Sequence, residues 1–312
     1  MRAFVFPGQG AQALGMGREL AQAYPAAQAI FDEVDDALGE KLTDVIWGED
    51  LDTLTLTQNA QPALMATSLA VMAALKAEGV GMEAASFVAG HSLGEYSALA
   101  AAGTFTVADA ARLLRKRGEA MQAAVPVGQG AMAAVLGLDF DGVTALAEKA
   151  AQGDVCQVAN QNDPTQNVIS GHKAAVERAV TMAKEAGAKR ALLLPVSAPF
   201  HCAMMAPAAD VMAQALGDVE MAAPLVPVVA NVLAEAVSEP DRIRDLLVEQ
   251  VTGQVRWMSS VEWMGAQGVT EIWEIGAGKA LSGMIRRINR DIECRAVLSP
   301  DDVKAAAAAI EG

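Results

Sequence analysis

The chain has 312 residues, 53% of them hydrophobic and 20% charged, with a formal net charge of −15 at pH 7. This composition excludes a disordered chain, and no apolar run approaches the roughly 18 residues that a membrane-spanning helix needs. The negative charge repels nucleic acid and anionic membranes, so we expect neither as a partner.

The cysteines and the N-terminus bear on the cellular compartment. Cys156, Cys202 and Cys294 form no pair at metal or redox spacing, and an odd number argues against a disulfide framework. We therefore expect buried thiols and no metal. The segment before Pro7 is too short for a secretory signal, so we predict a cytoplasmic protein, and we expect a monomer.

The first 125 residues predict alternating strands and helices, which is typical of an α/β fold. A strand over 2–6 leads into a glycine-rich turn and a helix that ends near residue 38. The pattern then predicts a helix over 58–78, a strand over 84–89, and helices over 92–102 and 106–123. Thr106-x-x-Asp109 is a capping pattern that opens the last of these helices.

The middle of the chain follows a different order, β-α-β-β-α-β, which is the signature of a ferredoxin-like unit. The expected strands are 131–138, 154–160, 166–170 and 189–194, and the expected helices are 139–151 and 172–187. Later strands are expected near 226–230, 271–275 and 295–298. We expect a hydrolase-like large domain with a parallel sheet, over 1–125 and 197–312, and an inserted ferredoxin-like small domain over 126–196.

The most informative motif is Gly90-His91-Ser92-Leu93-Gly94, between an apolar run and a helical segment. Gly-x-Ser-x-Gly is the spacing of a nucleophile elbow, in which glycines on both sides let a serine occupy a tight turn from strand to helix. The serine hydroxyl then lies at a helix N-terminus, where free backbone N–H groups stabilise a developing oxyanion. The motif predicts Ser92 as a nucleophile.

A nucleophilic serine needs a base, and the chain has three histidines. His91 adjoins Ser92 but points in a different direction around a tight turn, and His172 opens a helix, where capping or core packing is expected. His201 remains, and the order serine then histidine agrees with hydrolase-type sites. Asp210, Asp245 or a backbone carbonyl would each serve to orient the imidazole.

Arg117 falls on the apolar face of its predicted helix, while Arg112 and Lys116 point away from it. A guanidinium on the core side needs an anion. One interpretation is an ion pair with a protein carboxylate, and another is a side chain whose charged end reaches solvent. The third is bidentate recognition of a substrate carboxylate, for which arginine geometry is suited.

Two glycine-rich turns imitate nucleotide-binding patterns. Gly8 to Ala13 fits the dinucleotide form with Asp32 downstream, but 27–38 has helical spacing where a ribose-binding acid would end a strand. Gly276-Ala277-Gly278-Lys279 lacks the first glycine of a phosphate loop, because Trp273 stands at that position. We interpret both as structural turns, with no cofactor.

Four motifs together resemble the malonyl-CoA:acyl carrier protein transacylases of fatty acid synthesis, over essentially the whole chain. They are Phe6-Pro7-Gly8-Gln9-Gly10-Ala11-Gln12, Gly90-His91-Ser92-Leu93-Gly94-Glu95-Tyr96-Ser97, Arg115-Lys116-Arg117-Gly118 and Pro199-Phe200-His201. The resemblance implies Ser92 as the acylated nucleophile, His201 as its base and Arg117 as the clamp for the malonyl carboxylate. It also implies malonyl-CoA and acyl carrier protein as partners.

Further roles are implied around this centre. The backbone N–H groups of Gln9 and Leu93 would form the oxyanion hole, and the carbonyl of Gln250 would orient the base. Positions implied to line the acyl pocket are Met121, Asn160, His91 and Phe200. The Phe200 ring is expected to crowd an α-methyl group, which disfavours methylmalonyl by ~1 to 3 kcal/mol.

Three alternatives stay open on sequence alone. A serine esterase or thioesterase would use the same elbow with water as acceptor, and a catalytically silent module would only bind carrier protein. The same transfer would also serve polyketide synthesis. An acidic carrier protein must find a local basic patch, for which the candidates are Arg115, Lys116, Lys189, Arg190, Arg286 and Arg287.

Overall fold

Two β-sheets organise the chain in the computed structural model, which describes residues 1–196 and 198–311. The larger sheet has the strand order β10-β9-β1-β2-β7-β8, in which all pairs are parallel except β7 with β8. Its strands are β1 (Arg2–Phe6), β2 (Phe87–Gly90), β7 (Val228–Val229), β8 (Ala236–Val237), β9 (Glu271–Ile275) and β10 (Glu293–Val297). Phe6 pairs with Gly90, so the loops after β1 and β2 leave the sheet side by side.

Side chains alternate between the two faces of this sheet, as the pleat requires. Phe4, Phe6 and Trp273 point into the main core, whereas Ala3 and Val5 point into a second cluster on the opposite face. Helices α12 (Trp257–Ala266) and α13 (Ala280–Ile288) cover the second face. The main core is covered by α2 (Pro25–Leu38), α5 (Thr57–Ala77), α6 (Gly94–Ala101), α7 (Val107–Ala123), α10 (Ala206–Gly217), α11 (Pro240–Thr252) and α14 (Pro300–Glu311).

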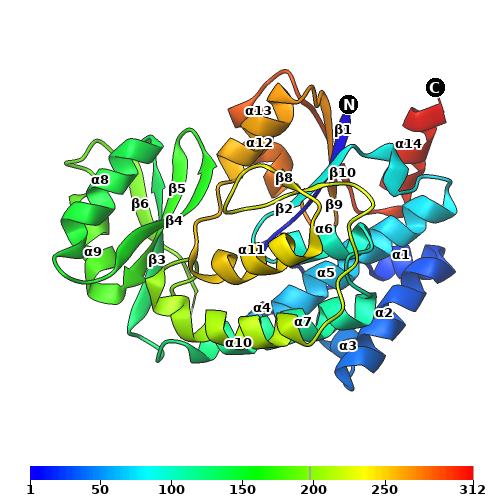
Figure 1. Cartoon of the computed structure of the whole chain (residues 1–312), viewed down its shortest axis with the longest axis horizontal. Coiled ribbons are helices and arrows are strands. Elements are labelled where there is room, and N and C mark those ends of the chain that lie inside the picture. Colours follow the sequence, from blue (N-terminus) through cyan, green and yellow to red (C-terminus); the bar gives the residue numbers. More distant parts are fainter. Residues whose placement is uncertain (197, 312) are drawn as a thin grey trace.

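The smaller sheet is antiparallel, with the order β4-β5-β3-β6. Its elements are β3 (Gly130–Leu136), α8 (Phe140–Ala151), β4 (Cys156–Asp163), β5 (Gln166–His172), α9 (Lys173–Met182) and β6 (Arg190–Leu193). Ala133, Val135 and Ile169 pack beneath α8 and α9, while Met132 and Val168 on the other face join the main core. Figure 1 shows this sheet and its two helices in green at one end of the molecule.

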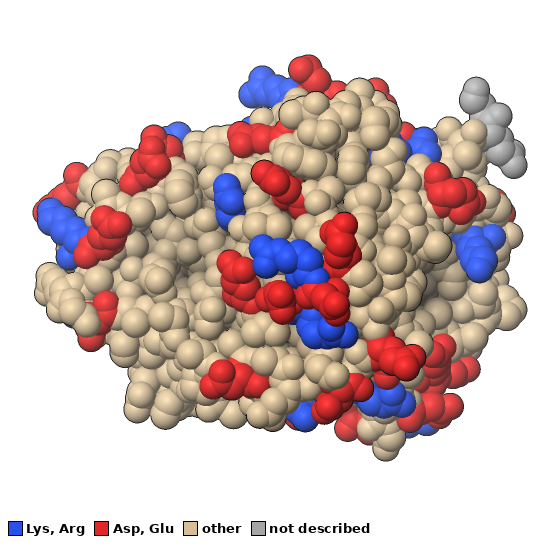
Figure 2. Space-filling view, in the orientation of Figure 1, with Lys and Arg blue, Asp and Glu red and all other residues tan. Residues whose placement is uncertain are grey.

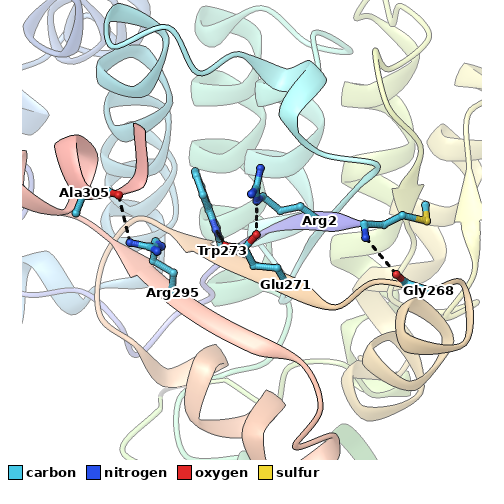
Figure 3. A network of polar contacts seen from close by, with 7 residues as sticks. Arg2, Gly268, Glu271, Trp273, Arg295 and Ala305 are labelled. Atoms are coloured by element: carbon cyan, nitrogen blue, oxygen red, sulfur yellow. Dashed lines mark hydrogen bonds and ion pairs between the residues drawn. The ribbon is translucent and has the colours of Figure 1, made fainter. Parts of the chain in front are cut away.

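A polar network joins three neighbouring strands of the large sheet near the start of β1 (Figure 3). Arg2 Nε donates to Glu271 Oε2 over 2.7 Å, and the indole of Trp273 donates to Glu271 Oε1 over 2.6 Å. The guanidinium carbons of Arg2 and Arg295 lie 4.5 and 5.8 Å from the Trp273 ring centroid, within cation–π range. This network ties β1, β9 and β10 together.

The mixed α/β fold, with one parallel and one antiparallel sheet, agrees with prediction, and so does the order of elements over 130–195. Thr106 Oγ1 accepts from the Asp109 N–H over 3.0 Å, which confirms the predicted cap. The single helix expected before residue 38 is wrong: Pro25 opens a second helix after α1 (Arg18–Ala23). The helix expected over 172–187 ends at Met182.

Several short elements had no sequence signal. They are α3 (Leu42–Ile46), α4 (Leu51–Thr55), β8 and the 3₁₀ turns Met82–Ala84 and Ala203–Met205. Cys156 and Cys202 are buried as expected, but Cys294 is only half-buried. None of the helices in the described part of the chain combines the length and apolar character that crossing a bilayer needs.

Candidate active site

The Gly90–Gly94 motif forms the predicted turn between β2 and α6. Ser92 has φ of 55°, in the left-handed region that non-glycine residues rarely occupy. A β-carbon on Gly94 would lie 2.2 Å from the Phe6 carbonyl oxygen, and one on Gly90 would lie 1.9 Å from the Gly94 carbonyl group. Both glycines are therefore required by the close approach of backbone to backbone.

Asn231 holds this turn in place from a distant part of the chain. Its Oδ1 accepts from the Ser92 N–H over 2.8 Å, and its Nδ2 donates to the Gly90 carbonyl over 2.6 Å. Asn231 is almost fully buried, and its amide satisfies both the Ser92 N–H and the buried Gly90 carbonyl.

His201 faces the serine, with its Nε2 2.7 Å from Ser92 Oγ. Its Nδ1 lies 2.9 Å from the carbonyl of Gln250 and 3.1 Å from that of Gly253. Because carbonyls only accept, Nδ1 carries the proton and Nε2 is free to accept one from the serine. Backbone carbonyls therefore orient the imidazole, and the two candidate acids, Asp210 and Asp245, are exposed.

Burial, together with the nearby charge of Arg117, lowers the pKa of His201 to about 3. An imidazole so placed stays neutral well below the pH at which a free histidine protonates. The site thus holds His201 in the form that accepts a proton.

Arg117 projects from α7 into the same site and is only 1% exposed. Its Nη1 donates to Gln61 Oε1 over 2.8 Å, and its Nη2 donates to Gln250 Oε1 over 2.8 Å and to Ser92 Oγ over 3.2 Å. No described carboxylate forms an ion pair with it, and its Nε is buried without a partner. Within the described chain, the ion-pair and solvent-reaching interpretations are therefore wrong.

Glu95 is a buried carboxyl group that sequence reasoning missed. Its Oε2 accepts from the Asn231 N–H over 3.1 Å and from Gln250 Nε2 over 2.9 Å. Burial raises the pKa of Glu95 to about 7. The signal was present in the sequence as a charged residue in the otherwise apolar first turn after the serine.

The first glycine-rich loop packs against the elbow. A β-carbon on Gly8 would lie 2.6 Å from the His91 carbonyl oxygen, so the backbone at Gly8 directly contacts the elbow turn. Gln9 is the next residue along the chain. Within the described residues, the backbone N–H groups of Gln9 and Leu93 have no hydrogen-bond acceptor. Two free amides beside a serine hydroxyl suit an oxyanion.

The other residues expected to line the acyl pocket differ in how closely they are connected to Ser92 and Arg117. Met121 Sδ is 3.8 Å from Gln61 Nε2, which links it to Arg117, and buried Phe200 directly precedes His201. His91 turns away from the serine hydroxyl toward Asn162, with Nε2 2.8 Å from Oδ1, and burial lowers its pKa. Asn160 lies in β4 beside Val255, and no described contact ties its side chain to Ser92.

The structure also shows the places of His172, of Asp32 and of the second glycine-rich turn. His172 Nδ1 accepts from the Val155 N–H over 2.9 Å, so its role is structural, although its side chain does not cap the helix. Asp32 lies within α2, as the helical spacing predicted. Gly276 and Gly278 form the turn from β9 to α13, where a β-carbon on Gly276 would lie 2.3 Å from Ser68 Oγ.

The six basic residues named as docking candidates lie on or beside three separate elements. Arg115 pairs with Glu40, and Arg287 Nε pairs with Asp163 Oδ2 over 2.7 Å. The six lie on or beside α7, β6 and α13, which Figure 1 places at the bottom, left and top of the molecule. Figure 2 shows Lys and Arg side chains in small groups beside Asp and Glu on the face in view.

Comparisons with known proteins agree with this geometry. The family model described as "Acyl transferase domain" matches residues 3–271. The malonyl CoA-acyl carrier protein transacylase of Bacillus subtilis is 47% identical over 305 residues, which cover 97% of this chain and 95% of that protein.

Two solved structures are similar along the whole chain. The acyl-carrier-protein-S-malonyltransferase of Bartonella henselae has a TM-score of 0.97 and 54% identity, covering 100% of this chain and 99% of that one. A malonyl-transacylase solved with its type II PKS acyl-carrier protein has a TM-score of 0.96 and 42% identity, with 99% of each chain covered.

Proposed function

Since the chain belongs to the acyl transferase family, among the malonyl CoA-acyl carrier protein transacylases, we propose that it transfers malonyl groups from malonyl-CoA to acyl carrier protein. The acceptor is the phosphopantetheine thiol of the carrier, and the transfer serves fatty acid synthesis. The observation that carries this proposal is the convergence of Ser92, His201 and Arg117 within hydrogen-bond distance.

In the first step, Ser92 Oγ attacks the thioester carbon of malonyl-CoA while its proton passes to His201 Nε2. The carbonyl electron pair moves onto oxygen, where the N–H groups of Gln9 and Leu93 stabilise the charge. Collapse of this intermediate breaks the carbon–sulfur bond, and the departing thiolate takes the proton from His201. The product is a malonyl ester on Ser92.

In the second step, the carrier thiol gives its proton to His201 and attacks the ester, and Ser92 leaves with that proton. Donor and acceptor are thioesters of the same kind of thiol, so little free energy separates them. The enzyme must therefore keep water from the ester. Ping-pong kinetics follow from the covalent intermediate.

Arg117 is proposed as the carboxylate clamp. Its guanidinium is buried, and its partners in the free protein are neutral amides and a hydroxyl. A malonyl carboxylate would supply the anion that no described side chain provides, through charge-assisted hydrogen bonds. A simple esterase has no need of such a group.

The carrier would dock near the end of α13. Arg287 pairs with Asp163, the neighbour in sequence of Asn162, which in turn contacts His91 beside the nucleophile. Arg286 is exposed at the same helix end. This group is linked to the site through Asp163, its neighbour Asn162 and His91, and positive charge there suits an acidic carrier.

We propose that residues 1–125 and 197–312 form a hydrolase-like domain and residues 126–196 a ferredoxin-like domain. The two separate sheets and the β-α-β-β-α-β order support this division, while Ser197 at the proposed boundary lies outside the described residues. We also propose that the protein is cytoplasmic and monomeric, and sedimentation analysis tests the oligomeric state.

The direct test is a transfer assay with malonyl-CoA and holo carrier protein, in which the masses of carrier and free malonate are followed together. Malonyl-carrier should accumulate much faster than malonate. Release of malonate without malonyl-carrier would favour a thioesterase, and no consumption of malonyl-CoA would favour a module that only binds the carrier.

A further inference from the structure

Glu95 lies at the centre of a buried polar network beneath the nucleophile. It is in the first turn of α6, three residues after Ser92, and is 1% exposed. One carboxyl oxygen, Oε2, accepts from both Asn231 and Gln250, at 3.1 and 2.9 Å. Both contacts require only an acceptor, so they persist whether the carboxyl group is ionised or neutral.

The Gln250 side chain carries this contact onward to two parts of the site. Its Nε2 also donates to the Ser92 carbonyl over 2.9 Å, and its Oε1 accepts from Arg117 Nη2 over 2.8 Å. The two ends of an amide differ in hydrogen-bonding sense. With Nε2 directed at Glu95, Oε1 must face the guanidinium.

This arrangement places one neutral amide between the carboxyl group and Arg117. A carboxylate in direct contact would neutralise the guanidinium and compete with a substrate anion. The amide instead fixes the guanidinium in position and leaves it without a directly bound anion. Asn231, the second partner of Glu95, holds the backbone of Ser92 at its left-handed φ.

We propose that Glu95 is a positioning residue for malonyl selection: it orients the Gln250 amide that positions Arg117, and it positions Asn231, which holds the Ser92 turn. This inference rests on the proposed function. The Ser92 contribution affects every acyl group alike, whereas the Arg117 contribution affects only acyl groups that carry a carboxylate. The ratio of malonyl to acetyl acylation therefore isolates the second contribution.

The experiment measures acylation of Ser92 by mass spectrometry in single turnovers, with malonyl-CoA and acetyl-CoA in separate reactions. Glu95→Ala should lower the malonyl-to-acetyl ratio roughly tenfold, because Arg117 loses its fixed partner. Glu95→Gln keeps an acceptor for Asn231 and Gln250, so its ratio should stay within about threefold of that of the unaltered protein. A ratio that falls as far in Glu95→Gln as in Glu95→Ala would overturn hydrogen-bond positioning.

Glu274→Ala is the matched control. Glu274 is also a fully buried glutamate that accepts two N–H groups, from Leu281 and Ser282 at 3.0 and 2.8 Å, but it caps α13 instead of contacting the Ser92 surroundings. Its loss should destabilise the fold without changing the ratio. An equal change of ratio in this control would overturn the assignment to Glu95.

Thermal melts identify which variants fold. If Glu95→Ala does not fold, Glu95→Asp takes its place, because its carboxylate is one methylene shorter and withdraws from both partners. Its ratio should also fall, and an unchanged ratio would overturn the proposal. Failure of the proposed function is separate from all of these outcomes, since it would appear as absence of a malonyl adduct on the unaltered protein.

Discussion

Arg117 donates a hydrogen bond of 3.2 Å from Nη2 to the Oγ of Ser92, the atom that His201 also contacts. A buried positive charge therefore lies beside both the nucleophile and the base. The same charge lowers the pKa of His201. A substrate carboxylate on Arg117 would offset this effect, so a single side chain connects recognition of the acyl group with the strength of the base.

Removal of the guanidinium should separate malonyl from acetyl transfer. In Arg117→Ala, malonyl transfer should fall roughly tenfold to a hundredfold, the loss of ~1.5 to 3 kcal/mol of charge-assisted binding, while acetyl transfer survives or improves. Arg117→Lys keeps a charge but not the two-pronged geometry and should remain impaired. Steady-state rates with both acyl-CoAs measure this, and equal losses for the two substrates would contradict the clamp.

The fall in the rate of Ser92 acylation on the acid side of its pH profile should be centred well below pH 6.5. Because the folded pKa of His201 is lowered to about 3, the imidazole remains an effective base as the pH falls through the range in which free histidine protonates. Rapid-quench rates from pH 4.5 to 8 test this, with Glu95→Gln as the background so that its carboxyl group does not titrate. A fall centred near 6.5 in that background would contradict the prediction.

The close packing at the elbow makes Gly94 intolerant of a side chain. In Gly94→Ala the β-carbon would lie 2.2 Å from the Phe6 carbonyl oxygen, and backbone has to move to admit it. We expect a loss of about 3 kcal/mol or more in the free energy of unfolding. Gly217→Ala is the control, because a β-carbon there meets no atom within 4 Å, so helix propensity should leave it neutral or slightly stabilised. Chemical denaturation of both variants decides the matter, and similar stabilities would contradict the packing argument.

The parts of the site that sequence predicted are those with local patterns. Gly-x-Ser-x-Gly fixes a turn through steric requirements at neighbouring residues, and the position of Arg117 on an apolar helix face implies burial without knowledge of the fold. His201 followed from the small number of histidines. Each of these depends on residues close in sequence or on simple elimination.

The supporting polar groups had no such pattern. Gln61, Glu95 and Asn231 come from separate segments, and their contacts exist only because the helices and the β7–β8 region pack together. Clusters of basic residues in the sequence likewise do not show whether α7, β6 and α13 share a face. The short helices after α2 also depend on packing, since they are too brief to show a period.

The buried carboxyl group of Glu95 should make stability depend on pH. Its pKa is raised from 4.5 to about 7, so the folded state favours the protonated form. The stabilisation that Glu95 gives the folded state is fully present below pH 4.5 and is lost as the pH rises through about 7. The loss in the free energy of unfolding is on the order of a few kcal/mol at most. The stability of the unaltered protein relative to Glu95→Gln should therefore decrease between pH 5.5 and 8, as measured by denaturant unfolding. A difference that stays constant over this range would contradict the raised pKa.

The central claim is that Ser92 carries the malonyl group, and intact-protein and peptide mass spectrometry after brief incubation with malonyl-CoA tests it most directly. We predict one malonyl adduct, on the peptide containing Ser92, absent from Ser92→Ala and discharged by holo carrier protein. An unmodified protein, or an adduct that persists in Ser92→Ala, would contradict the account.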